Sequence, residues 1–521
     1  MLKKLEKTMM SITYVYLLLP ILLFVAGWLK PPVAIILVLL LIYAGMKAVT
    51  SYTPKEYESE NSSGKPPAHK IITGLFILLG IIYWVTLSGI GGFSFQNDDF
   101  ELRNAMLRDL TNFNWPVKYD YPATPNIHDL AGHQGALVYY FVYWLPAALF
   151  GKLSGGFEGA NSFLFGWSVL GLVLGFYWFS RAVKKTSILL LLLFVFWSGM
   201  DAIGWWVQRG SHFGAGEHIE WWSSFFQYSA NTTALFWVFN QAVVPWIIVM
   251  LLCNQPSKKT VIFTYSLCLP YAPFSFIGLA PFMLYFSVSG KDAEKIFSRK
   301  KIINFKALWH NVNAAFSIPN LVAAPVLIGV FLLFFYNTGS RFSNGLIWSP
   351  LTGPYNYYGD RTDTLSLLCA YFLFCLFEFG IYVLLIRNKF KKDPVFLITV
   401  GSLLLIPSYK MGIYNDFVMR VSIPALTFLM VYVAKFLTAP IYNNRKLLSL
   451  KIILVAFLLI GAITPFNEIY RSIDITTHNP QGIINDHWHT LSTLEEFKTG
   501  GIGNFVVQDP QNTFFFKYLG K

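Results

Sequence analysis

The chain has 521 residues, of which 55% are hydrophobic, 18% aromatic and only 13% charged, against roughly 25% charged in a soluble domain. Its mean hydropathy is +0.50. These values exclude an ordinary soluble protein and predict an all-α, polytopic membrane protein, because a helix satisfies its own backbone in lipid. The net charge of +13 is then expected in loops at the membrane surface, and no nucleic-acid partner is expected.

Residues 1–70 predict a transmembrane hairpin followed by a cytoplasmic loop. The apolar runs 11–29 and 33–49 flank Lys30-Pro31-Pro32, where proline begins a helix without losing a needed donor. Residues 50–70 are rich in Ser, Pro, Lys and Glu, which is typical of a linker.

Residues 71–465 predict the main transmembrane domain. The span 71–90 leads into a polar segment, 91–134, placed on the external side. The run 135–153, interrupted by Pro146, is interpreted as re-entrant, because the next span is followed by a basic cluster at 181–185 that favours the cytoplasm. Three prolines within 261–289 predict two short helices there.

The remaining apolar runs alternate between the two sides of the membrane. This assignment places most Lys and Arg inside and most Asp and Glu outside, which is the positive-inside pattern. It predicts about 13 crossings of a cytoplasmic (inner) membrane, with the N-terminus cytoplasmic and the C-terminus external. Residues 466–521 are interpreted as a short external tail, with a strand-like run at 504–508.

The polar segment opens with three acids, Asp98, Asp99 and Glu101. Carboxylates at a membrane surface can act as a general base on an acceptor, and Asp98 and Asp99 could share a divalent cation such as Mg²⁺ or Mn²⁺. The alternative is helix capping, with Asn97 or Asp98 at the N-cap and Glu101 completing a capping box.

Three cations, Arg341, Lys410 and Arg420, lie in external loops that otherwise have few positive charges. They are candidates to hold a phosphate, since Arg presents a planar fork and Lys a point charge. Snorkelling, or an i,i+4 pair between Asp416 and Arg420, would explain them equally well.

Four further polar residues are candidates for contacting a substrate, namely His128, His133, His212 and Glu217. With His218 and Glu220 they are also of types that bind metals, but their spacing is not diagnostic. Solvated loop positions are the simpler interpretation.

An acidic pair in the first large external loop, directly after a span, resembles the GT-C class of integral membrane glycosyltransferases. The following LRNAMLRDLTNFNWPV resembles the surface helix that such enzymes carry, and HQGALVYYFVYWLPAALFGKL resembles their next apolar stretch. The resemblance covers about residues 71–440. The extra hairpin at 11–49 and the short tail depart from the pattern.

The resemblance implies transfer of a sugar, with inversion, from a polyprenyl-phosphate donor to a glycan, lipid or protein acceptor of the cell envelope. Asp98 or Asp99 would be the base, and Lys410, Arg420 and Arg341 would neutralise the leaving phosphate. Two alternatives stay open. One is a transporter or flippase of lipid-linked glycans that uses Glu378, an acid within a span; the other is a capsule or O-antigen type polymerase.

Overall fold

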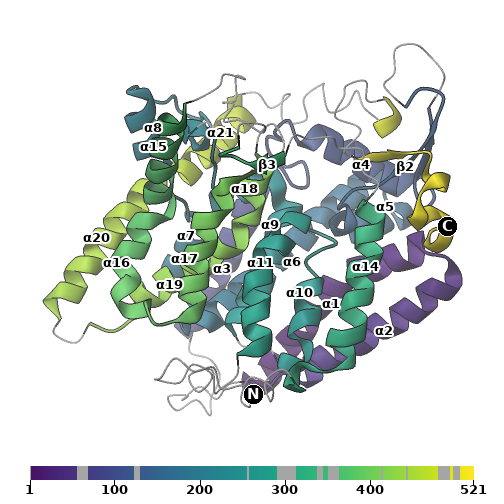
Figure 1. The fold of residues 1–521 in the computed structure, drawn as a ribbon, viewed down its shortest axis with the longest axis horizontal. Helices are drawn as coiled ribbons and strands as arrows, with labels where there is room; N and C mark the ends of the chain where they lie inside the picture. The colour runs from purple at the N-terminus through teal and green to yellow at the C-terminus, as the bar shows by residue number, and fades with distance from the viewer. Residues whose placement is uncertain are drawn as a thin grey trace.

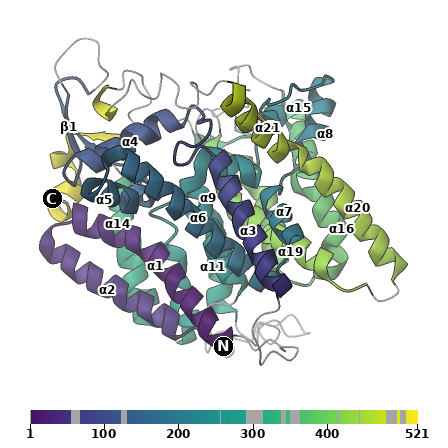
Figure 2. The same cartoon turned by 180° about the vertical axis from the view of Figure 1, so that it is seen from behind.

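The computed structural model describes residues 2–54, 68–121, 130–223, 225–254, 257–289, 313–336, 344–349, 363–411, 415–441, 444–478, 493–496 and 505–521. Helices dominate these residues and pack side by side in a bundle (Figures 1 and 2). The all-α class predicted from composition is therefore confirmed.

Within the described residues, seven helices are long and apolar enough to cross a membrane. In two of them, consecutive helical elements follow one another without a loop and count as one long helix. The seven are α1 (Leu2–Trp28), α2 (Pro31–Thr50), α3 (Ala68–Leu87), α6 (Gly156–Val183), α9 (Asn231–Cys253), α15–η5–α16 (Thr364–Cys375, Leu376–Gly380, Ile381–Phe390) and α20–α21 (Arg445–Gly461, Ile463–His478). The chain is thus a membrane protein by the length and composition of its helices.

Shorter helices complete the bundle. Four are apolar and of intermediate length: α11 (Pro273–Val288), η4–α14 (Pro319–Ala323, Ala324–Phe335), α17–η6 (Pro394–Leu405, Ile406–Ser408) and α19 (Ile423–Thr438). The shortest are α4 (Phe100–Asn112), α5 (Leu145–Leu153), α7 (Ile188–Val195), α8 (Asp201–Arg209), α10 (Val261–Ser266), α18 (Asp416–Val421), η1 (Val142–Trp144), η2 (Ile219–Ser223), η3 (Lys258–Thr260), η8 (Leu494–Glu496), η10 (Pro510–Asn512) and η11 (Phe515–Leu519).

Two segments that were expected to lack a full-length spanning helix contain only short helices. Residues 135–153 contain only η1 and the nine-residue α5 beyond a strand, and nine residues at 1.5 Å each reach only about 14 Å. This segment therefore has no helix able to cross a ~30 Å hydrocarbon layer. Residues 261–289 form two helices, α10 and α11, as their prolines predicted.

The middle of the bundle contains a helix that is broken. α7 ends at Val195, and residues 196–200 continue without helical structure. Neighbouring side chains satisfy the freed carbonyls: Asn231 Nδ2 donates to Phe194 O at 2.8 Å, and Tyr382 Oη donates to Ser198 O at 3.0 Å. Irregular backbone at this depth is tolerated only where protein groups replace water in this way.

α9 lies at the centre of the fold, with 94% of its most apolar window buried. It contains Pro245 and a kink at Val238, where φ is −143° and ψ is 41°. The kink frees the carbonyl of Phe236, which accepts a hydrogen bond from Asn97 Nδ2 at 2.9 Å. This hydrogen bond joins residues 91–134, which we call the acidic segment, to α9.

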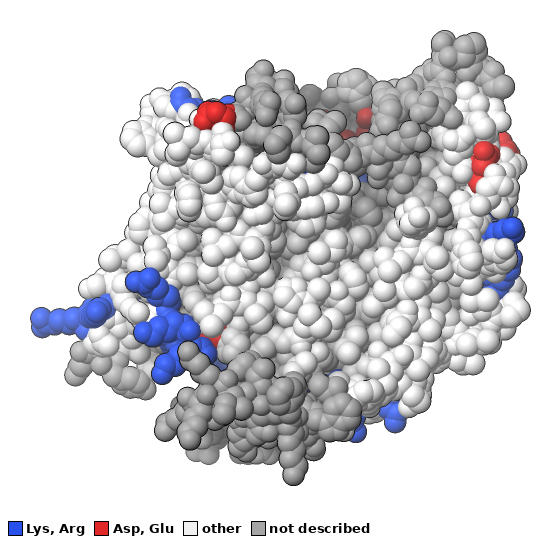
Figure 3. Space-filling view, in the orientation of Figure 1, with Lys and Arg blue, Asp and Glu red and all other residues white. Residues whose placement is uncertain are grey.

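Charge is divided between the two ends of the bundle. The largest group of Lys and Arg side chains in Figure 3 lies at the lower left, over the ends of α16 and α20, while Asp and Glu appear toward the upper end. Arg387 and Lys389 are in the last turn of α16, and Arg445 begins α20. We call this the basic end; α4, α8 and α21 lie at the opposite, acidic end (Figure 1).

Two small sheets lie at the acidic end. In the first, β1 (Lys118–Asp120), β2 (Gln134–Leu137) and β5 (Val506–Gln508) pair antiparallel, with Tyr119 opposite Gly135 and Ala136 opposite Val507. In the second, β3 (Asn344–Leu346) pairs with β4 (Tyr409–Met411). The strand-like run predicted at 504–508 is therefore confirmed at Val506–Gln508, and it pairs with residues 135–137 of β2.

The tail predicted at 466–521 begins instead with a helix. α21 runs from Ile463 to His478 at the acidic end and buries Asn467 and Glu468. Farther on, the chain reaches the tip of the first hairpin, where Leu29 forms a bridge with Gly520. Residues 505–521 are thus packed against the bundle.

Candidate functional site

The acidic segment follows a tight glycine turn at the end of α3. Gly89 has φ of +82° and Gly92 of +76°, values that glycine adopts without strain. Gln96 Nε2 donates to Gly89 O at 2.9 Å and closes the turn. The backbone N–H of Asp99 then bonds Asn97 Oδ1 at 3.1 Å, which places Asp99 at the first turn of α4.

Asp99 pairs with a cation rather than capping its helix. Its side chain makes no capping hydrogen bond; instead, Oδ2 accepts from Arg103 Nη2 at 2.6 Å across one helical turn. The Arg103 side chain is 6% exposed and that of Asp99 is 42% exposed. One carboxylate oxygen is therefore fixed by a buried guanidinium, and the carboxyl group still reaches solvent.

Arg103 has a donor that none of the described residues satisfies. Its guanidinium lies 5.6 Å from the ring centroids of both Phe100 and Phe239. Its Nη1 atom is buried and has no hydrogen-bond partner in the described part of the chain. A buried charged donor without an acceptor is costly, so this atom marks a place where an anionic or carbonyl oxygen fits.

Arg420 reaches the same region from α18. It pairs with Asp416 at 3.0 Å, and its Nη1 donates to Tyr140 Oη at 3.2 Å. Ser275 Oγ donates to the Arg420 backbone carbonyl at 2.9 Å, which fixes α18 on α11. The predicted i,i+4 pair is thus present, together with a contact to Tyr140 in the run 135–153.

These groups interact electrostatically with one another. Burial alone would lower the pKa of the Arg420 guanidinium. Asp416, Tyr140, Tyr139 and, more weakly, Asp99 outweigh this effect and raise the pKa. Burial raises the pKa of Tyr139 well above its usual value, although Arg103 and Arg420 oppose this. Asp99 and Arg103 are four residues apart, whereas Arg420 lies more than 300 residues farther along the sequence. Both guanidinium groups act on Tyr139, and Arg420 also bonds Tyr140.

Phe505, the residue directly before β5, packs on these tyrosines. The Phe505 ring stacks on Tyr139 with centroids 4.3 Å apart, and Tyr139 lies 3.7 Å from Tyr140. The backbone N–H of Val138 donates to Phe505 O at 2.8 Å. Residues near the end of the sequence therefore hold the tyrosines in place.

The other predicted site residues have different surroundings. Asp98 is exposed, and Glu101 is partly buried on α4. Lys410 lies in β4, where burial lowers the pKa of its ammonium group. His133 Nδ1 lies 2.9 Å from Asp509 Oδ2, beside β5. Two predicted residues, Arg341 and His128, lie outside the described residues.

His212 and Glu217 belong to a different part of the acidic end. Both are exposed, and Glu217 Oε2 accepts the backbone N–H of Gly214 at 2.9 Å. The loop carrying them packs on α21, since Gly216 N–H donates to Asn467 Oδ1 at 2.7 Å. Among the described residues, neither forms a hydrogen bond or ion pair with Asp99, Arg103 or Arg420.

Beside that loop lies a second buried polar cluster. His218 Nδ1 is 2.7 Å from Glu468 Oε1, and Arg471 Nη2 is 2.6 Å from Glu468 Oε2. Glu220 accepts from Gln227 Nε2 at 2.6 Å and from the backbone N–H of Ala230. Deeper still, Glu378 is 2% exposed and accepts from Trp222 Nε1 at 3.1 Å.

Metal binding finds no support in these side chains. Among the described residues, no three or more His, Cys, Asp or Glu side chains gather in a way that could hold a metal ion. At the predicted acidic pair, Asp98 is exposed and one oxygen of Asp99 is bonded to Arg103. A divalent cation there stays a prediction, and no step below depends on one.

Sequence reasoning missed Arg103, Tyr139 and Tyr140. Arg103 lies four residues after Asp99, so its pairing was readable from helical spacing, but its burial was not. The tyrosines belong to a run interpreted only as apolar. Glu468 and Arg471 were missed because their helix was interpreted as a tail.

Comparisons with known proteins return no relative. No family model matches the sequence. No curated protein and no solved structure is significantly similar to the chain. What the fold defines is an α-helical membrane protein, and its activity has to be argued from its own side chains.

Proposed function

We propose that the chain is a GT-C-like membrane glycosyltransferase that moves a sugar from a polyprenyl-phosphate donor to an acceptor of the cell envelope. The observation that supports this is the meeting of Asp99, Arg103 and Arg420 at the acidic end of the bundle. A transferase of this kind needs a base for the acceptor and cations for a phosphate leaving group, close together at a membrane surface.

In the proposed reaction, a hydroxyl or amine of a glycan, lipid or protein acceptor attacks the anomeric carbon. Its proton passes to the Asp99 carboxylate, and the bond from the anomeric carbon to the phosphate oxygen breaks. A single displacement inverts the anomeric centre. The released polyprenyl phosphate takes the bonding electron pair, and its oxygens are received by Arg103 Nη1, Arg420 and Lys410.

The orientation follows from charge. The basic end faces the cytoplasm by the positive-inside rule, which places Asp99 on the external side of the cytoplasmic membrane. About 13 crossings, N-terminus inside and C-terminus outside, are retained in this proposal. The extended residues 196–200 would then complete a crossing begun by the short α7.

Released polyprenyl phosphate gives an assay that does not require knowing the sugar. Membranes containing the full chain are given a panel of undecaprenyl-phosphate hexoses, and free undecaprenyl phosphate is measured by mass spectrometry. Asp99→Asn is expected to lower release by about 10²- to 10⁴-fold, the usual contribution of a general base. Asp120→Asn, at an exposed aspartate of the same segment, should release normally.

Binding separates the base from the phosphate site. Undecaprenyl phosphate should bind Asp99→Asn as tightly as wild type, but Arg420→Gln about 10-fold more weakly, because a charge-assisted bond is lost. Full release by Asp98→Asn, Asp99→Asn and the double variant would refute the enzyme.

The rival function, a transporter of lipid-linked glycans, has one observation in its favour. Glu378 is a buried acid on a predicted span, and it interacts electrostatically with Asp201 and Glu220. Such groups usually have a function. If Glu378→Gln abolished activity while Asp99→Asn did not, the transporter would replace the glycosyltransferase.

A further inference from the structure

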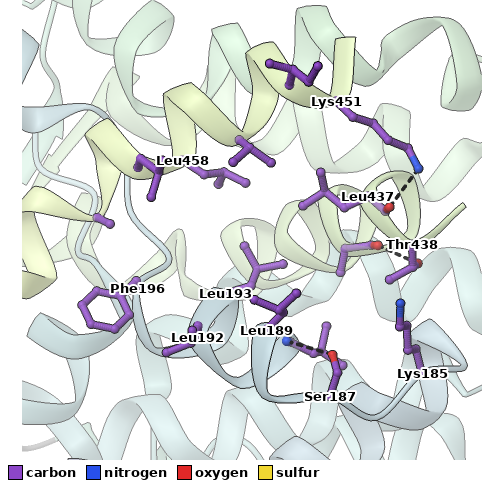
Figure 4. A pocket seen from close by; sticks show the side chains of 16 residues that line it. Lys185, Ser187, Leu189, Leu192, Leu193, Phe196, Leu437, Thr438, Lys451 and Leu458 are labelled. Atoms are coloured by element: carbon purple, nitrogen blue, oxygen red, sulfur yellow. Dashed lines mark hydrogen bonds between the residues drawn. The ribbon is translucent and has the colours of Figure 1, made fainter. Parts of the chain in front are cut away.

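A lateral cavity of about 770 Å³ lies between α7, α19 and α20. Leucines from α7, Leu189 and Leu193, face Leu458 of α20 across it, as Figure 4 shows. Leu189 is 76% exposed and Leu459 67% exposed, so the cavity opens toward the surroundings of the bundle rather than into its core. We call it the lateral groove.

The groove exists because its three walls are separated. α7 has only eight residues, and α20 packs on α16 and α8. At the basic end, Lys451 of α20 reaches across to α19 and donates to Leu437 O at 2.9 Å and to Ala439 O. This crossing contact ties α20 to α19 at one end and leaves the apolar walls apart beyond it.

Two lysines mark the basic end of the groove. In Figure 4, Lys185 and Lys451 lie at the same end, with Leu437 and Thr438 between them, and Phe196 lies at the other end. Lys451 is 7% exposed and is repelled by Lys185. Neither lysine forms an ion pair with a described acid. Two cations that line the same end of the groove without a described counter-charge favour an anion there.

The length of the groove matches one leaflet. Its wall on α20 runs from Lys451 to Ala462, and eleven steps of 1.5 Å span about 16 Å. A hydrocarbon layer is ~30 Å thick, so the groove extends from one surface to about the middle. A lipid tail in that leaflet would lie along its apolar walls with its headgroup at the lysines.

We propose that the lateral groove is a binding site for one anionic phospholipid of the leaflet at the basic end. The lipid phosphate lies between Lys185 and Lys451, and an acyl chain lies against Leu193, Val455 and Leu458. Lysines at the cytoplasmic surface attract anionic lipid in general; here a buried lysine and a leaflet-long groove fix one position. The site lies at the opposite end from Asp99 and does not depend on the proposed transferase activity.

The test is native mass spectrometry of the purified, delipidated full chain. Phosphatidylglycerol and phosphatidylcholine with the same acyl chains are the probes. Wild type is expected to retain one phosphatidylglycerol in preference to phosphatidylcholine. Lys185→Ala, at an exposed position, should weaken retention about 5-fold, the effect of one lysine near a surface. Lys446→Ala, an exposed lysine of α20 outside the groove, is the matched control and should change nothing.

A second variant tests the apolar part. Val455→Trp fills the groove without touching a lysine and should abolish retention of phosphatidylglycerol, while the unchanged melting temperature of the variant shows that the bundle is intact. Equal retention of both lipids by wild type would overturn the proposal. So would an equal loss in Lys185→Ala and Lys446→Ala, or retention by folded Val455→Trp. A dimer that survives delipidation and dissociates in Val455→Trp would assign the groove to a second copy instead.

Discussion

At the scale of single residues, Arg103 has the most demanding environment near the acidic pair. Its charge is buried, one donor is bonded to Asp99, and another, Nη1, has no acceptor among the described residues. Because Asp99 is 42% exposed, loss of this pair should cost less than the ~3–5 kcal/mol of a fully buried pair. Its position is explained best by a ligand that completes its hydrogen bonds.

A second residue-scale feature is the pairing of His218 with Glu220, whose charged atoms lie 3.9 Å apart. Burial raises the pKa of Glu220 from 4.5 to about 7, with a contribution from Asp201. The pKa of His218 is also raised: burial alone would lower it, but the hydrogen bond and charge of Glu468 outweigh that effect. In both groups the folded state binds protons more tightly than the unfolded chain.

The sign of the pH dependence follows from linkage. Stability from Glu220 is complete below about pH 4.5 and is lost as the pH rises to about 7; His218 adds a loss above its unfolded pKa of about 6.5. We expect the melting temperature to fall between pH 5 and 8, with Glu220 contributing on the order of 3 kcal/mol. Differential scanning fluorimetry across this range measures it.

Glu220→Gln keeps the shape of the side chain and removes its titration. Its melting temperature should therefore vary less with pH than that of wild type. An equally steep profile in Glu220→Gln would show that other groups cause the dependence. Glu217→Gln, at an exposed position of the same loop, is the matched control and should keep the wild-type profile.

At the scale of elements, β5 is the feature that joins the end of the chain to the acidic segment. Deleting residues 505–521 removes the strand partner of β2 and the ring stacked on Tyr139. We expect the amide hydrogens of β2 to exchange at least about 10-fold faster, because each lost backbone bond is worth about 1 kcal/mol. Hydrogen-exchange mass spectrometry of the peptide containing residues 134–138 measures this.

Phe514→Ala is the control in the same segment, since Phe514 is 55% exposed. It should leave exchange in β2 unchanged. Unaltered exchange in the deletion itself would mean that β1 alone protects β2.

Sequence patterns were informative for long elements and poor for short ones. Composition predicted the helical membrane class, and prolines predicted the division of α10 from α11. α21 was missed because it directly continues α20 and its polar residues resemble a loop, although Glu468 and Arg471 share a face. The break after α7 was not predictable, since its carbonyls are satisfied by Asn231 and Tyr382 from distant parts of the sequence.

In the candidate site, too, some residues were predictable from the sequence and others were not. Asp99 and Arg420 were identified because their residue types are unusual at those places, and the charge of Asp99 contributes to stabilising the Arg420 guanidinium. Arg103 and the two tyrosines, which interact with these residues, depend on packing that one sequence does not reveal. Charge patterns therefore predicted Asp99 and Arg420, but not the buried residues that interact with them.

At the scale of the whole molecule, the separation of charge predicts the orientation of the bundle. Asp120 lies at the acidic end and Lys446 at the basic end, and both are exposed. In a background with the four native cysteines replaced by serine, the Asp120→Cys variant should react with a membrane-impermeant maleimide in right-side-out vesicles. The Lys446→Cys variant should react only after detergent is added.

The two variants control for each other, since each must react in detergent. Reaction of both in sealed vesicles would mean that the two ends lie on the same side. Reaction of Lys446→Cys alone would reverse the orientation and place Asp99 in the cytoplasm.

The break after α7 also dictates an order of assembly during synthesis. The backbone at Phe194, Ser198 and Met200 is satisfied by groups from Asn231, Tyr382 and Phe377. An eight-residue helix followed by unpaired backbone is not stable alone in lipid. We therefore expect this segment to reach its final position in the bilayer only after residue 382 has been synthesised.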